Sequence, residues 1–108
     1  MQITIHVICK KQLSLRDAIL EDGKNGRLDE YDLWVKAAKS NFRPHGWTKV
    51  LGKGIDGALN INYVANAKTL VARVITKGGK PGPLFGKFLQ YLWERHRRDI
   101  KGILIDPE

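Results

Sequence analysis

The first segment of the chain alternates apolar and polar residues. In residues 2–9, Ile3, Ile5, Val7 and Cys9 alternate with polar side chains. A period of two is typical of a half-buried strand, and β-branched residues favour an extended backbone. The pattern predicts a strand with one face in the core and places the single cysteine, Cys9, among the core residues.

Two further extended runs follow in the second half of the chain. Residues 58–64 and 68–76 are rich in Ile, Val, Leu and Thr, and the short segment between them contains Asn66, a residue type that tolerates a left-handed backbone. We therefore expect a hairpin. Residues 41–57 lack a clean period and contain four glycines, so they are predicted to be a long loop with a short strand at 47–51.

Helical periodicity separates these runs. Ser14, with Asp17 three residues on, resembles a capping box, and glycines close the short apolar stripe that follows. Apolar residues recur mainly at three- and four-residue intervals in 28–40, with acidic residues early and lysines late, which predicts a second helix. Pro83 suits the first turn of a last helix, and a short strand is expected at 103–105. The expected apolar stripe of that last helix is Leu84, Phe85, Phe88, Leu89, Leu92 and Trp93.

The order strand, helix, strand, strand, helix, strand predicts the α+β class. It indicates one domain over residues 1–108, in a βαββαβ (ferredoxin-like) arrangement with an antiparallel sheet and helices on one face. Strand phase then predicts the side chains that face the helices: Ile3, Ile5, Val7, Leu59, Ile61, Tyr63, Leu70, Ala72 and Val74. The opposite face receives Thr4, His6, Asn60, Asn62, Arg73 and Lys77, together with the apolar Val71 and Ile75. Because Val71 and Ile75 are apolar, the alternative is that this face is half covered by the loop at 41–57 or by a second protomer.

Charge is distributed unevenly along the chain. Residues 1–35 carry a net charge of −1, residues 36–101 a net charge of +11 and residues 102–108 a net charge of −2, which gives +8 for the whole chain. A segment this positive repels itself, so an anionic partner is expected, with nucleic acid (RNA or DNA) ahead of a membrane surface.

Three basic segments are candidate phosphate contacts. The first interleaves cations with aromatic rings, a combination that binds single-stranded nucleic acid. The second is a glycine-rich turn before a helix, although its spacing does not match a nucleotide-binding P-loop. The third is an arginine-rich helix end, where dipole complementation is the competing explanation. The candidate nucleic-acid-binding residues are Arg43, His45, Trp47, Lys49, Lys53, Arg73, Lys77, Lys80, Lys87, Arg95, Arg97, Arg98 and Lys101.

Catalytic and metal-binding signals are weaker. His6, His45 and His96 are scattered and none has a helical ligand spacing, so no metal or other cofactor is expected. A metal-free ribonuclease would need a histidine or two and a cation, for which His6, His45, Arg73 and Arg95 are candidates. Helices followed by a hairpin also resemble, in layout, the small ribosome-targeting toxin ribonucleases. An RNA recognition motif is disfavoured, because it places aromatic residues on the open face of its sheet and Tyr63 has core phase.

Two other function classes therefore stay open beside a basic nucleic-acid-binding domain. One is an interaction or small-ligand-binding protein whose charge serves solubility or an acidic partner, and the other is the metal-free ribonuclease. A single cysteine excludes an intramolecular disulfide, and no charged-then-apolar leader or membrane-spanning apolar stretch occurs. We expect a cytoplasmic protein without a membrane partner, and the sequence does not fix whether it forms a homo-oligomer.

Overall fold

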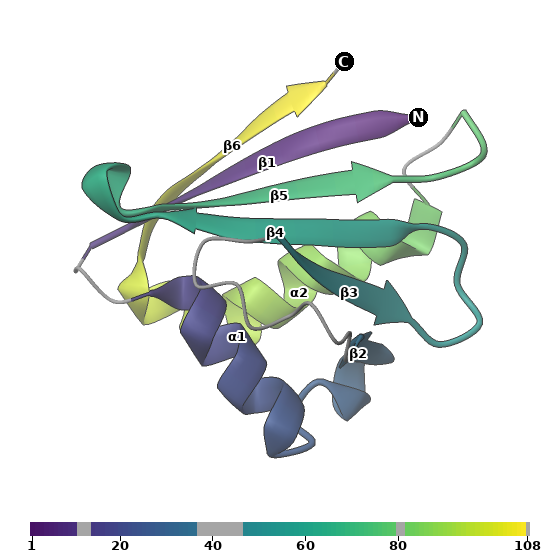
Figure 1. Cartoon of the computed structure of the whole chain (residues 1–108), viewed down its shortest axis with the longest axis horizontal. Helices are drawn as coiled ribbons and strands as arrows, with labels where there is room; N and C mark the ends of the chain where they lie inside the picture. Colours follow the sequence, from purple (N-terminus) through teal and green to yellow (C-terminus); the bar gives the residue numbers. More distant parts are fainter. Residues whose placement is uncertain (11–13, 37–46, 80–81, 108) are drawn as a thin grey trace.

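Two helices pack against one face of a six-stranded antiparallel sheet (Figure 1). The computed structural model describes residues 1–10, 14–36, 47–79 and 82–107. The elements in chain order are β1 (Gln2–Cys9), α1 (Leu15–Lys24), the 3₁₀ turn η1 (Asp29–Tyr31), β2 (Leu33–Val35), β3 (Thr48–Gly52), β4 (Ala58–Val64), η2 (Ala65–Ala67), β5 (Thr69–Ile75), α2 (Gly82–His96), η3 (Arg97–Asp99) and β6 (Ile100–Pro107).

The strand order across the sheet is β2-β3-β4-β5-β1-β6, and all neighbouring strands are antiparallel. The predicted α+β class is confirmed. The full order differs from a four-stranded ferredoxin-like sheet, because β2 and β3 extend it beyond β4. Strand β6 forms the opposite edge, and it runs well beyond the expected 103–105.

The core lies between the sheet and the helices, and strand phase decides which residues enter it. Ile3, Ile5 and Val7 on β1 are buried, as predicted, and so are Leu59 and Ile61 on β4. The remaining expected core positions are also buried except Tyr63, which is half-buried and packs against the core edge. Cys9 is buried as expected.

The expected helix at 28–40 is wrong over its described part. Its beginning forms the short turn η1, which ends where Asp32 adopts a left-handed backbone with φ 56°. Leu33, Trp34 and Val35 then pair with β3, with Leu33 buried and Trp34 exposed. Bulky aromatic and β-branched residues fit a pleated surface, so tertiary pairing overrides the helical spacing. Residues 37–40 lie outside the described residues.

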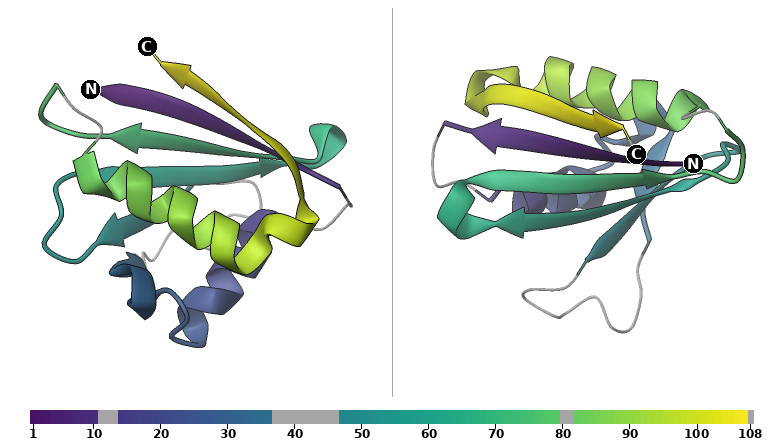
Figure 2. Two further views of the ribbon diagram at one scale, coloured as in Figure 1. Left: turned by 180° about the vertical axis from the view of Figure 1, so that it is seen from behind. Right: turned by 90° about the horizontal axis from the view of Figure 1, so that it is seen from above.

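The other two helices are found where the sequence predicts them. Ser14 Oγ accepts from the backbone N–H of Asp17 and caps α1. The apolar stripe of α2 needs one correction, because Trp93 is 67% exposed and Tyr91 is fully buried in its place. In the hairpin turn, Lys68 rather than Asn66 has the left-handed backbone. Figure 2 shows α2 lying across one face of the sheet, so the other face is free of described helices.

Candidate nucleic-acid interface

The face of the sheet turned away from the helices carries a row of polar side chains. Strand register places Lys49 of β3 opposite Asn60 of β4, and Asn60 opposite Arg73 of β5. Arg73 is in turn opposite Thr4 of β1. Directly opposed residues share a face, so these four side chains cross the sheet in one line. We call this surface the open face.

An arginine and a tryptophan form the centre of the open face. The guanidinium carbon of Arg73 lies 4.7 Å from the ring centroid of Trp47, the residue before β3. This is within the range of a cation–π contact. Trp47 remains 42% exposed, so the ring is fixed in place by Arg73 while part of its surface stays in solvent.

A second tryptophan lies on the same face. Trp34 of β2 is opposite Leu51, which lies two residues beyond Lys49 on β3 and therefore has the same phase. Trp34 is also exposed. The sequence analysis missed this residue, because it assigned the segment to a helix.

A shallow depression continues the open face toward β6. Register places Asn62 opposite Val71, Val71 opposite His6, and His6 opposite Leu104. The depression is lined by His6, Val71, Leu104 and neighbouring small and aliphatic side chains. It is mostly apolar, as a surface in contact with the flat face of a base would be.

The glycine-rich turn and the β3–β4 turn meet at one end of the sheet. The backbone N–H of Lys77 donates to Asp56 Oδ2 at 3.1 Å, which joins the segment after β5 to the turn that carries Lys53. Both lysines are exposed beside the open face. Arg43, His45 and Lys80 lie outside the described residues.

Helix α2 lies on the other side of the sheet (Figure 2), and it carries Lys87 and Arg95, while Arg97 and Arg98 follow on η3 and Lys101 on β6. Several of them already have partners: Lys87 Nζ is 2.9 Å from Asp32 Oδ2, and the Arg97 guanidinium lies over the Trp93 ring. Arg98 and Lys101 are exposed. The three basic segments therefore do not all converge on one surface.

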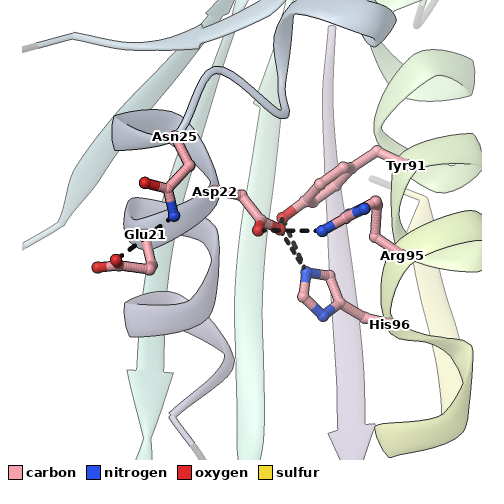
Figure 3. Close-up of polar contacts among 6 residues, drawn as sticks. All are labelled: Glu21, Asp22, Asn25, Tyr91, Arg95 and His96. Carbon is pink, nitrogen blue, oxygen red and sulfur yellow. Dashed lines mark hydrogen bonds and ion pairs between the residues drawn. The ribbon is translucent and has the colours of Figure 1, made fainter.

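The sequence analysis also missed a buried polar cluster that ties α1 to α2. The Tyr91 hydroxyl donates to Asp22 Oδ2 at 2.6 Å, and His96 Nε2 lies 2.8 Å from the same oxygen (Figure 3). Arg95 approaches the other carboxylate oxygen at 3.6 Å. His96 is nearly buried, and Arg95 forms an ion pair with a protein carboxylate.

Opposing effects set the ionisation of this cluster. Burial alone would raise the pKa of Asp22, but hydrogen bonds from Tyr91 and His96 and the nearby positive charges outweigh it, so the pKa of Asp22 is lowered. Burial and the Asp22 carboxylate raise the pKa of Tyr91 well above its ordinary value. Asp22 is thus a charged acceptor and Tyr91 a neutral donor, an arrangement that holds the helices together.

Other chemistry finds little support among the described residues. No group of three His, Cys, Asp or Glu side chains in residues 1–10, 14–36, 47–79 and 82–107 is placed to hold a metal ion. Burial, with a smaller contribution from Asp99, raises the pKa of the Cys9 thiol, which disfavours the reactive thiolate. In the same part of the chain, no helix has the length and apolar character needed to cross a bilayer.

Comparisons with known proteins add no relative. The chain matches no protein-family model, no curated protein and no solved structure. The residues of the open face are therefore the basis for a functional proposal.

Proposed function

We propose that this protein binds single-stranded nucleic acid on the open face of its sheet. The observation that carries the proposal is the exposed Trp47 ring held under the Arg73 guanidinium. Nucleic-acid binding sites that accept single strands combine aromatic rings for base stacking with cations that follow the backbone. Here the aromatic ring precedes β3 and the cation lies on β5, with β4 between these two strands.

The neighbours of this pair supply the other contacts that a single strand needs. Lys49 and Arg73 offer positive charge to phosphates, and the amides of Asn60 and Asn62 can donate to and accept from base edges. Trp34 gives a second exposed ring beyond Lys49 on the same face. The proposed nucleic-acid contacts therefore do not include Arg95, Arg97 and Arg98, which lie on α2 and η3.

The topology supports the same proposal. We propose that β1, β4, β5 and β6, with α1 and α2, correspond to the four strands and two helices of the βαββαβ plan, and that η1, β2 and β3 are an insertion after α1. Four-stranded sheets of this kind bind RNA through aromatic residues on the open face in RNA recognition motifs. In this chain the exposed aromatic residues would come from the inserted strand β2 and the start of β3, while Tyr63 points to the core edge.

Loss of the Trp47 ring tests the proposal. A labelled oligonucleotide of about six nucleotides is within the range of lengths that one such surface binds. Its affinity is measured at low salt by fluorescence anisotropy, with RNA and DNA in parallel. Trp47→Ala should weaken binding by about 10- to 100-fold, since a stacked base contributes about 1–3 kcal/mol. Trp93→Ala is the matched control, because Trp93 is exposed on α2.

Equal affinity of the two variants would contradict the proposal. The proposal would also be contradicted if the wild type bound neither RNA nor DNA. Cleavage of the RNA during the titration would instead favour the ribonuclease alternative, with His6 of the open face as the first residue to replace.

A further inference from the structure

Strand β6 is an edge strand with an apolar centre. It pairs with β1 on one side, and no other strand of the described residues lies beyond it in the sheet. Ile103, Leu104 and Ile105 on this strand are 38%, 61% and 47% exposed. Lys101, Asp106 and Pro107 lie near the ends of this eight-residue strand, and charges and prolines are features that protect an edge strand from pairing. The apolar centre between them carries neither feature and is a template for pairing with another strand.

The apolar layer of the core also continues past this edge. Ile103 is opposite Val7, and Ile105 is opposite Ile5. Val7 and Ile5 are completely buried, yet their partners on β6 are open to solvent on the side that carries α2. On that side the exposed Trp93 of α2 and Ile103 line a common hollow. The apolar side chains of the core layer are therefore not fully covered at β6.

We infer that a second copy of this chain completes this layer, with the two β6 strands paired antiparallel about a two-fold axis perpendicular to the sheet. In such a pair, Leu104 of one copy lies opposite Leu104 of the other, and each Ile103 lies opposite an Ile105. The apolar triplet of each strand thus meets its own counterpart, as an isologous interface requires.

The charges of β6 favour this antiparallel self-pairing. Lys101 lies near the beginning of the strand and Asp106 near its end. Antiparallel pairing places the basic end of one strand beside the acidic end of the other, whereas parallel pairing would bring like charges together. The strand is therefore complementary to itself in one direction only.

The exposed area fits a reversible dimer. An aromatic side chain carries about 150–250 Å² and an aliphatic one roughly half of that. With exposed fractions of 67% for Trp93 and 38%, 61% and 47% for the apolar triplet, these side chains expose roughly 200–350 Å² on each copy, or roughly 400–700 Å² for a pair. A specific interface buries at least about 1,000 Å², so the proposed dimer also requires burial of the paired strand edges and of the side-chain stems of Arg97 and Lys101. This dimer does not depend on the proposed nucleic-acid binding.

Sedimentation equilibrium of the full chain over a dilution series tests the inference. The wild type should reach twice the 12.2 kDa of one chain. Leu104→Lys should raise the dimer dissociation constant about tenfold or more, because it places two like charges face to face. Val64→Lys is the control, since Val64 is a 41% exposed aliphatic residue at the far end of β4. Circular dichroism melts establish that both variants are folded.

A covalent trap tests the register in a chain whose surface charge is unchanged. Leu104→Cys should form a disulfide-linked dimer under mild oxidation, because directly opposed residues of antiparallel strands have Cα separations that suit a disulfide. Val64→Cys should stay monomeric on a denaturing gel, and the buried Cys9 is common to both. A wild type that is monomeric at every soluble concentration overturns the inference. A dimer that Leu104→Lys leaves intact, or that Leu104→Cys fails to trap more than the control, assigns the interface elsewhere and also overturns it.

Discussion

On the helix-covered side of the sheet, Arg95 ends 3.6 Å from a buried carboxylate, whereas on the open side Arg73 ends over the ring of Trp47. Both residues belong to the basic segment of the chain. The first has its charge balanced by Asp22, and the second packs on an aromatic face that leaves its charge uncompensated by a carboxylate among the described residues. An arginine with a buried acidic partner stabilises the fold, and one without such a partner is available to a ligand.

The histidines differ in the same way. His96 lies against Asp22 and Tyr91 and is nearly buried. His6 is half-buried on the open face, opposite Val71 and Leu104. A histidine and an aspartate in contact resemble a catalytic pair, but here a tyrosine hydroxyl and an arginine share the same carboxylate, and all four groups join α1 to α2. Polar contact alone therefore does not distinguish a functional site from a contact that only stabilises the fold.

The largest expected effect tests the assignment of the two faces. Ile61 is fully buried on β4, and its neighbour Asn60 lies on the open face. Ile61→Asp would bury an unpaired carboxylate and should lower the free energy of unfolding by more than about 4 kcal/mol. Asn60→Asp should change it by no more than about 0.5 kcal/mol. Urea unfolding compares the two, and similar losses would mean that the faces are wrongly assigned.

Removal of the buried carboxylate should have the next largest effect. Asp22→Ala removes the buried carboxylate that Tyr91 and His96 both contact, so we expect a loss of about 1–3 kcal/mol in the free energy of unfolding. Asp29→Ala is the control, because Asp29 is exposed. Oligonucleotide affinity should be the same for wild type and Asp22→Ala. If Asp22→Ala is as stable as the wild type but binds the oligonucleotide more weakly, the nucleic-acid site lies on the helix-covered side of the sheet and not on the open face.

Acid should weaken the same tie. The folded pKa of Asp22 is lowered, so this group stabilises the fold above its unfolded pKa of about 3.9. That contribution is lost as the pH falls through the folded pKa. Thermal melts of Asp22→Asn from neutral pH to pH 2 should therefore show a smaller acid loss than the wild type. If Asp22→Asn loses as much thermal stability between neutral pH and pH 2 as the wild type does, other carboxylates account for the acid sensitivity.

The strand phases and helix caps could be predicted from the sequence, because both depend on local spacing. The period of two in β1 identifies its buried face, and Ser14 identifies the beginning of α1. Strand β2 could not be predicted in this way. It has only three residues, and it exists because Leu33 and Val35 pair with a strand that begins after residue 47.

The sites depend even more on tertiary structure. Asp22 and His96 are 74 residues apart, and no spacing rule connects an acid on one helix to a histidine on another. Trp47 and Arg73 were both candidates, but only the register of β3, β4 and β5 brings them together. Whether the three basic segments share one surface could not be predicted either, because charge counted along the chain does not show which face of the sheet a helix covers.

The smallest expected effect compares one arginine from each side of the sheet. Arg73→Gln and Arg98→Gln remove the same charge from exposed positions, one on the open face and one beyond α2. If phosphates lie along the open face, Arg73→Gln should reduce the slope of log affinity against log salt by about 0.7 for single-stranded nucleic acid. Arg98→Gln should leave the slope unchanged, and both variants should melt close to the wild type. Salt titrations of one oligonucleotide with the three proteins measure the difference.

Equal slopes for Arg73→Gln and Arg98→Gln would contradict the proposed site. They would show that the net charge of the chain, and not an arginine on the open face, attracts the nucleic acid.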